Sequence, residues 1–238
     1  MATEITSSVP SADTAISSVP SLQNGDRMTQ AEFLRRYNAM PHVQHAELVE
    51  GRVYMPSPVS AVRHGEPHFD LNGLLFCYRA MTPGVLGGDN STLKLDTDNA
   101  PQPDGYLRIA EEVGGQSKVV NGFIEGAPEL ILEIAASSVS YDLHEKRNAY
   151  RRNGVQEYVV LRTEDSAIDW FVLADGEYKP LPLDDDNIYR SRVFPGLWLD
   201  VAATLKGDAK QALDVLHQGI GHESHQAFAS SMKPINAQ

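Results

Sequence analysis

The residues best suited to chemistry are two acids and a lysine set among apolar neighbours. Glu133 lies inside residues 130–136, an apolar run whose length and branched side chains predict a buried strand. A buried carboxylate is costly unless it has a counter-charge, a proton or a metal ion. Lys146 follows on a predicted helix, and Asp104 ends an earlier segment after Pro103. An aspartate, a glutamate and a lysine that meet at one sheet edge are the arrangement of a metal-dependent phosphodiesterase.

The predicted helix after this strand directs Lys146 inward. At about 100° per residue, Leu143, Lys146 and Tyr150 share one helix face, which must turn toward the sheet. In the strand, Glu133 shares its face with Ala135, whose small side chain leaves room for a lysine from the next helix. Two alternatives stay open: the Lys146 stem extends so that its ammonium reaches solvent, or the Glu133–Lys146 pair is purely structural.

The chemistry that these side chains favour needs a divalent cation. Two carboxylates brought close together repel each other, and a hard cation between them removes the conflict. Mg²⁺, or Mn²⁺, would be held by Asp104 and Glu133 together with the backbone carbonyl of Ile134. Lys146 would position the attacking water or neutralise charge on the phosphoryl oxygens. Glu47 either adds an auxiliary acid from the N-terminal hairpin or is an ordinary surface residue.

Composition limits the function classes. With 238 residues and 42% hydrophobic residues, the chain is long enough for one sizeable core. The formal net charge of −12 opposes strong phosphate-driven DNA binding, so DNA is expected to bind weakly or with help from a partner. The lone Cys77 excludes an internal disulfide framework and favours a reducing cytoplasm. Neither a secretory leader nor an apolar run long enough to span a bilayer is apparent, so no membrane association is expected.

The pattern along the chain predicts a mixed α/β domain between two extensions. Residues 1–26 are rich in Ser and Pro and predict a disordered tail, residues 27–203 a globular domain, and residues 204–238 a helical C-terminal extension with a polar end. Thr29 and Glu32 predict a capping box at the start of a helix. The other expected elements are a hairpin over 47–55, a helix over 70–81, strands through 93–95, 105–109, 130–136 and 156–161, a helix opened by Ser138 or Ser140 and ending before Gly154, and a hairpin joining 168–173 to 178–181.

Several of these segments also resemble a known family. The motifs are Glu-Leu-Val-Glu-Gly over 47–51, Gln-Pro-Asp over 102–104, the run 126–134, Glu-Lys-Arg over 145–147 and Gly-Val-Gln-Glu-Tyr over 154–158. In this order they resemble the Uma family of restriction-endonuclease-like proteins, within the PD-(D/E)XK nuclease superfamily, over about residues 28–203.

The resemblance implies a fold and a site. The fold is a restriction-endonuclease-like mixed central sheet flanked by helices, with an N-terminal β-hairpin and a C-terminal helix. The site residues carried over are Glu47, Asp104, Glu133 and Lys146. The superfamily's usual lysine, two residues after the second acid, is Ala135 here, so the resemblance assigns its role to Lys146, as in the Uma family.

Histidines are the remaining candidates for the site. His64 matches the family's histidine after the hairpin and is a candidate for substrate contact, although a structural role is the alternative. The three histidines within residues 217–225 are spaced too loosely to predict a zinc site.

These features favour a cytoplasmic Mg²⁺-dependent DNA endonuclease, with a homodimer supplying one site for each strand. Recognition would come from loops such as residues 84–90 or from a partner. The alternative is a catalytically inactive nuclease-fold domain that binds a protein, which the negative charge favours. A glycosidase fits poorly, because two catalytic carboxylates have no use for an inward lysine.

Overall fold

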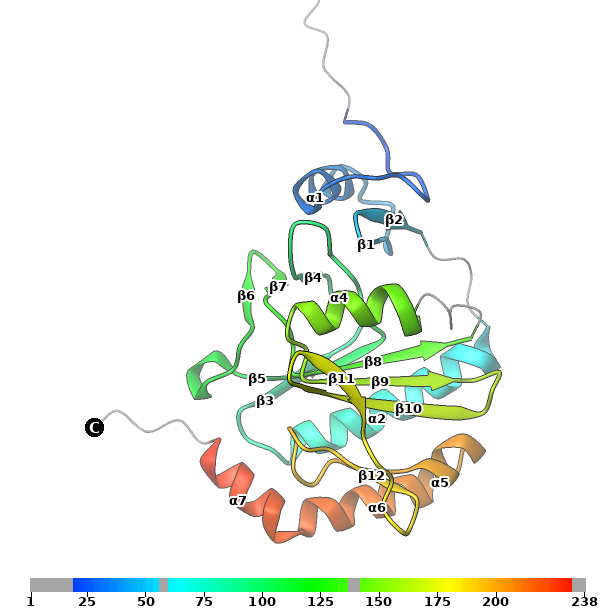
Figure 1. Ribbon diagram of the computed structural model, residues 1–238, viewed down its shortest axis with the longest axis vertical. Coiled ribbons are helices and arrows are strands. Elements are labelled where there is room, and N and C mark those ends of the chain that lie inside the picture. Colours follow the sequence, from blue (N-terminus) through cyan, green and yellow to red (C-terminus); the bar gives the residue numbers. More distant parts are fainter. Residues whose placement is uncertain (1–18, 56–59, 137–141, 233–238) are drawn as a thin grey trace, which may run out of the picture.

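A mixed six-stranded sheet organises the computed structural model, which describes residues 19–55, 60–136 and 142–232 (Figure 1). The strand order is β11-β10-β9-β8-β5-β3. Their bounds are β3 Val85–Gly88, β5 Gly105–Ile109, β8 Leu130–Ala135, β9 Glu157–Arg162, β10 Ala167–Ala174 and β11 Glu177–Pro180. Strands β8 and β9 pair parallel, and the other neighbours in this sheet pair antiparallel. A parallel pair needs a crossover connection, and the predicted strand-helix-strand unit supplies it.

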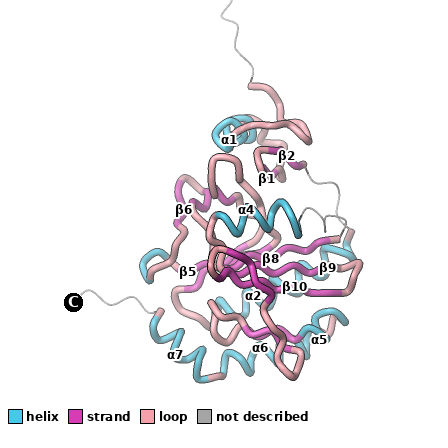
Figure 2. The backbone as a smooth tube through the Cα atoms, viewed as in Figure 1, coloured by secondary structure: helices cyan, strands magenta, loops and turns pink. Residues whose placement is uncertain are grey.

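Helices cover both faces of the sheet (Figures 1 and 2). Helix α4 (Arg147–Arg152), entered through a π-helical turn over Asp142–Lys146, covers one face. The opposite side carries α2 Glu66–Ala80, α5 Val201–Lys206, α6 Ala209–Gly221 and α7 Glu223–Ser231. The mixed α/β fold predicted from the sequence is therefore confirmed, and its C-terminal helix is resolved into α5, α6 and α7.

Strand β8 contributes alternate side chains to two separate cores. Leu130, Leu132 and Ile134 join the cluster that includes residues of α2 and α6. Ile131 and Ala135 join the cluster that includes Tyr150 of α4. Because side chains alternate along a strand, Glu133 lies on the α4 face, as the sequence predicts.

The N-terminal residues form a smaller unit above the sheet (Figure 1). It contains α1 (Gln30–Asn38), β1 (Glu47–Val49) and β2 (Arg52–Tyr54). The Thr29 side chain caps α1 as predicted, and β1 with β2 is the predicted hairpin. Leu22, in the segment assigned to the tail, is buried in the core of this unit, and the domain limits stay a prediction.

Some elements differ from the sequence expectation. The stretch expected to be irregular after β5 contains β6 (Lys118–Val120) and β7 (Phe123–Glu125), since Asn121 and Gly122 take the left-handed conformations of a tight hairpin turn. Strand β7 pairs with β4 (Leu93–Lys94) in a small sheet.

Three further differences concern the segment before α5, the start of helix α2 and the expected recognition loop. A short hairpin of β12 (Ile188–Arg190) and β13 (Trp198–Asp200) precedes α5. Helix α2 starts earlier than predicted, because a proline is tolerated in its first turn. Part of the expected recognition loop over residues 84–90 is strand β3.

Two expectations fall outside the part of the chain that the structure describes. The helix caps Ser138 and Ser140 lie in the undescribed segment 137–141, and the Leu143 side chain is not described either. In the described ranges, no helix combines the length and apolar character needed to cross a bilayer.

Candidate functional site

Two buried glutamates and one lysine meet where the N-terminal hairpin, β8 and the turn before α4 come together. Lys146 Nζ lies 2.9 Å from Glu133 Oε1 and 3.0 Å from Glu47 Oε1. All three side chains are buried, and Lys146 is only 4% exposed. The helix thus directs Lys146 inward, and the alternative in which its ammonium reaches solvent is excluded.

Strand β1 brings Glu47 to the lysine because the hairpin is tied to the segment before β5. Leu48 and Ala100 form a backbone bridge between the two segments. The Gln102 backbone N–H donates to Glu47 Oε1 at 2.6 Å. Glu47 is therefore an inward group at the cluster and not a surface residue.

Asp104 lies beside this cluster, directly before β5. Its Oδ2 accepts a hydrogen bond from the Ile134 N–H at 2.7 Å, and its Oδ1 lies 3.3 Å from His64 Nε2. Burial by itself raises the pKa of Asp104. The hydrogen bond and charge of His64, the charge of Lys146 and the Ile134 amide outweigh burial, so the pKa of this carboxyl is lowered.

His64 lies in a π-helical turn (Ala61–Gly65) directly before α2 and contacts the acids from there. Its Nδ1 lies 3.2 Å from the Ile134 carbonyl oxygen, while its Nε2 faces Asp104. The His64 ring stacks on His68 at a centroid distance of 5.6 Å. His64 and Asp104, with side chains 20% and 13% exposed, are the more open members of the group, so a substrate would approach from their side.

Tyr150 is a member of the cluster to which the sequence assigned no role. Its hydroxyl donates to Glu133 Oε1 at 2.7 Å, the same oxygen that contacts Lys146. Burial, followed by the nearby Glu133 charge, raises the pKa of Tyr150 well above its ordinary value, so the hydroxyl stays a donor. The sequence could have indicated Tyr150, because it lies four residues after Lys146 on the same helix face.

His45 is a second neighbour that sequence reasoning missed. Burial lowers the pKa of His45, and the charges of Glu47, Lys146, Asp104 and His64 also act on it, which puts its ring near the cluster. The available signal was its position two residues before Glu47.

The donor set suits a hard cation that keeps part of its water shell. The carboxylates of Glu47, Asp104 and Glu133 outnumber the ammonium of Lys146, and oxygen is the donor that Mg²⁺ prefers. Within the described ranges, no three histidine, cysteine or acidic side chains are grouped so as to hold a metal ion by themselves. A cation held by Asp104 and Glu133 would therefore need water or substrate oxygens to complete its coordination.

Comparison with known proteins agrees with this architecture. A solved structure described as a putative nuclease belonging to DUF820, from Anabaena variabilis ATCC 29413, superposes with a TM-score of 0.56 at 14% sequence identity. The match covers 75% of this chain and 98% of that one, and at this identity it shows a shared fold. No curated protein matches the chain.

The family comparison covers most of the sequence. Residues 30–202 match the model of the Uma2 family, described as "Putative restriction endonuclease". This range contains the Glu47, Asp104, Glu133, Lys146 and His64 side chains described above. The chain therefore belongs to the Uma2 family.

Proposed function

We propose that this chain is a metal-dependent endonuclease that hydrolyses phosphodiester bonds in DNA. The observation that supports it best is the buried contact of Lys146 with Glu47 and Glu133, beside an Asp104 whose pKa is lowered so that it stays ionised. In a purely structural ion pair, one carboxylate would balance the charge of one lysine. Here the acids exceed the lysine, and the excess negative charge suits a divalent cation.

The proposal assigns a role to each side chain. Asp104 and Glu133 hold Mg²⁺ or Mn²⁺, which when bound supplies Lewis-acid activation of water and of the phosphoryl group. The Lys146 ammonium holds the two glutamates together. It also neutralises part of the negative charge that develops on the phosphoryl oxygens. Glu47 is the auxiliary acid and helps to hold the ammonium in place.

His64 is proposed to contact the substrate. Its ring now contacts Asp104 Oδ1 and the Ile134 carbonyl, two oxygens expected on the cation. If Asp104 and the Ile134 carbonyl held a cation, it would compete with His64 for these oxygens. The released imidazole could then donate to a phosphate oxygen of the substrate.

The proposal includes a DNA substrate, a homodimer and a cytoplasmic setting. The net charge of −12 makes DNA binding weak without the cation or a partner protein. Binding should therefore strengthen when Mg²⁺ neutralises the acids at the site.

One experiment separates binding of the metal from catalysis. Calorimetric titration with Mg²⁺ and Mn²⁺ should show uptake by the unchanged chain and loss of uptake in Asp104→Asn and in Glu133→Gln. Cleavage of a panel of duplex and single-stranded DNA and RNA should require the metal and fall at least a hundredfold in Lys146→Met. Undiminished cleavage by Lys146→Met would show that the activity arises elsewhere or from a contaminant.

The rival function is an inactive nuclease-fold domain that binds a protein. The net charge of −12 favours it, whereas the retained acids and Lys146 oppose it. This rival predicts no Mg²⁺ uptake and no cleavage. The titration thus decides between the two.

A further inference from the structure

The outer face of helix α2 exposes two large aromatic side chains. Phe69 is 78% exposed and Phe76 is 61% exposed, whereas Leu74 on the other side of the helix is buried. Phe69, Gly73 and Phe76 are four and three residues apart, so they line one face directed away from the core. Two exposed aromatic rings on one helix face form an apolar surface that a partner could cover.

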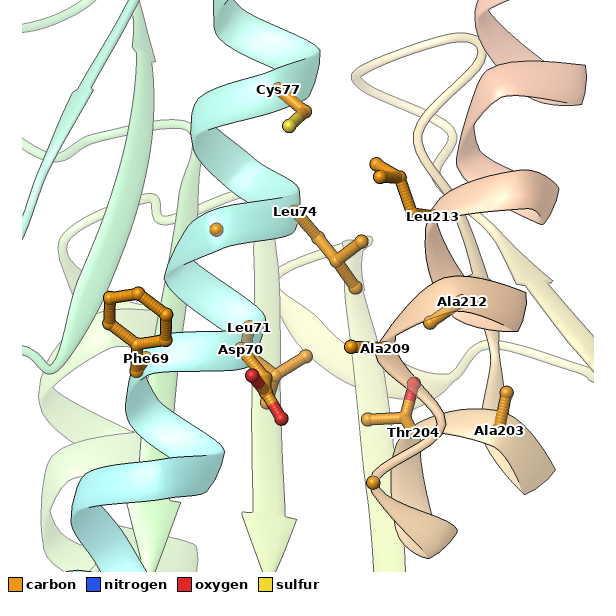
Figure 3. A pocket seen from close by; sticks show the side chains of 12 residues that line it. Phe69, Asp70, Leu71, Leu74, Cys77, Ala203, Thr204, Ala209, Ala212 and Leu213 are labelled. Atoms are coloured by element: carbon orange, nitrogen blue, oxygen red, sulfur yellow. The ribbon is translucent and has the colours of Figure 1, made fainter.

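Hollows flank this face on both sides. One, of about 190 Å³, lies between α2 and the α5–α6 segment, where Leu74 and Cys77 face Ala212 and Leu213 (Figure 3). Phe69 stands at its rim.

The second hollow lies on the other side of α2. It has about 180 Å³, separates the helix from the edge strand β3, and is bordered by Phe76 and Arg79. The face is therefore a ridge between two grooves, the form that packs against a copy of itself.

We propose that this face binds a second copy of the chain, with the two α2 helices antiparallel across a two-fold axis near Gly73. The midpoint between Phe69 and Phe76 falls between residues 72 and 73. With the axis at this point, Phe69 of one copy lies against Phe76 of the other copy. The Phe69 ring then covers Gly73 of that other copy. No atom lies within 4 Å of where a Gly73 side chain would begin, so the space for the ring exists.

Charge along α2 agrees with the antiparallel arrangement. Glu66 and Asp70 lie in the N-terminal half and Arg79 in the last turn. Among the residues that the structure describes, none of these three forms an ion pair within the chain. An antiparallel pair brings the acidic first turn of one helix alongside the basic last turn of the other, and opposes the helix dipoles favourably.

The length of the helix also allows this pairing. The 15 residues of α2 span about 22 Å, so both phenylalanines of one copy can lie against α2 of the other copy.

The oligomeric state of the full chain tests the proposal. Sedimentation velocity and light scattering should show a dimer at micromolar concentration. Phe69→Ser and Gly73→Gln should each weaken it at least tenfold. Gly73→Gln replaces a mid-helix glycine by a better helix former at an open position, so its melting temperature should not fall. Val119→Ser, which removes an apolar side chain that is 57% exposed on strand β6, is the matched control and should stay dimeric.

Cross-linking tests the axis itself. The double variant Glu66→Cys, Arg79→Cys in a Cys77→Ser background should form a disulfide-linked dimer on oxidation, because these two positions lie opposite each other across the proposed axis. Val119→Cys in the same background should not. A monomer at all concentrations would overturn the proposal. A dimer that persists in both Phe69→Ser and Gly73→Gln would also overturn it. So would a monomer that dimerises only after removal of residues 1–18, because those residues would then be what covers the α2 face in the full chain. These outcomes do not depend on whether the protein cleaves DNA.

Discussion

Replacing Lys146 by methionine keeps the length and apolar stem of the side chain and removes its charge. The ammonium contacts Glu133 and Glu47 at 2.9 and 3.0 Å, and the glutamate side chains are 4% and 8% exposed. Removing one partner from a buried ion pair typically costs about 3–5 kcal/mol, because the other charge stays buried without compensation. For a domain of this size, that loss corresponds to roughly 6–20 °C in melting temperature, at about 2–4 °C per kcal/mol.

Lys94→Met is the matched control for this prediction. Lys94 lies 3.2 Å from Glu125, but these side chains are 21% and 36% exposed. Such a pair contributes about 0–1 kcal/mol, so the control should lose no more than ~4 °C. The difference in melting temperature between the two variants therefore reports the effect of burying the ion pair, and not merely the loss of a lysine.

Scanning calorimetry with and without Mg²⁺ completes the experiment. If Asp104 and Glu133 hold a cation, Lys146→Met should gain more stability from Mg²⁺ than the unchanged chain does, because the uncompensated carboxylates attract it more strongly. At a concentration a hundredfold above Kd, binding adds about 2.7 kcal/mol. A Lys146→Met variant as stable as Lys94→Met would refute the reasoning, since the lysine would then not compensate buried acids.

Other side chains give shorter tests. Tyr150→Phe deletes a hydrogen bond to the charged Glu133 and should cost about 1.5–3 kcal/mol in urea unfolding; a loss below ~0.5 kcal/mol would mean that the hydroxyl does not hold the carboxylate. Gly196→Ala should lower the melting temperature markedly, because φ is +91° and the new Cβ would lie 2.7 Å from the Gly219 carbonyl oxygen; an unchanged melting temperature would contradict this packing. Burial lowers the pKa of His225, so the folded state binds fewer protons than the unfolded state just below pH 6.5. The contribution of His225 to stability is therefore present above that pH and lost as pH falls through the folded-state pKa. His225→Gln should flatten the pH dependence of unfolding in this window, and an unaltered slope would argue against it.

Local periodicity was enough to predict the fold around the site. The alternation of strand β8 put Glu133 on one face with Ala135, and the helical spacing put Lys146 on the face of Tyr150. Both predictions depend on side-chain direction within one element, which the backbone geometry of a strand or helix fixes. The hairpin turn at Glu50 and Gly51 was equally local, since both residues take the left-handed conformation that such a turn requires.

An acid in a buried strand was not by itself specific for the site. Glu157 is also an acid in a predicted strand, at the start of β9, and is fully buried, yet it accepts hydrogen bonds from the Ser191 hydroxyl and the Arg192 N–H. Burial outweighs these hydrogen bonds and raises the pKa of Glu157. Its partners come from the β12–β13 segment, which the sequence did not predict.

The sequence alone determined which way Glu133 and Lys146 face and that an α/β crossover joins them. Only the tertiary structure decided that Glu47 joins them and that His64 reaches Asp104. It also decided that the partners of Glu157 are neutral donors and not a lysine. The free energy of a buried charge depends on the groups within a few ångströms, and long-range folding brings those groups from segments whose local patterns carry no record of each other.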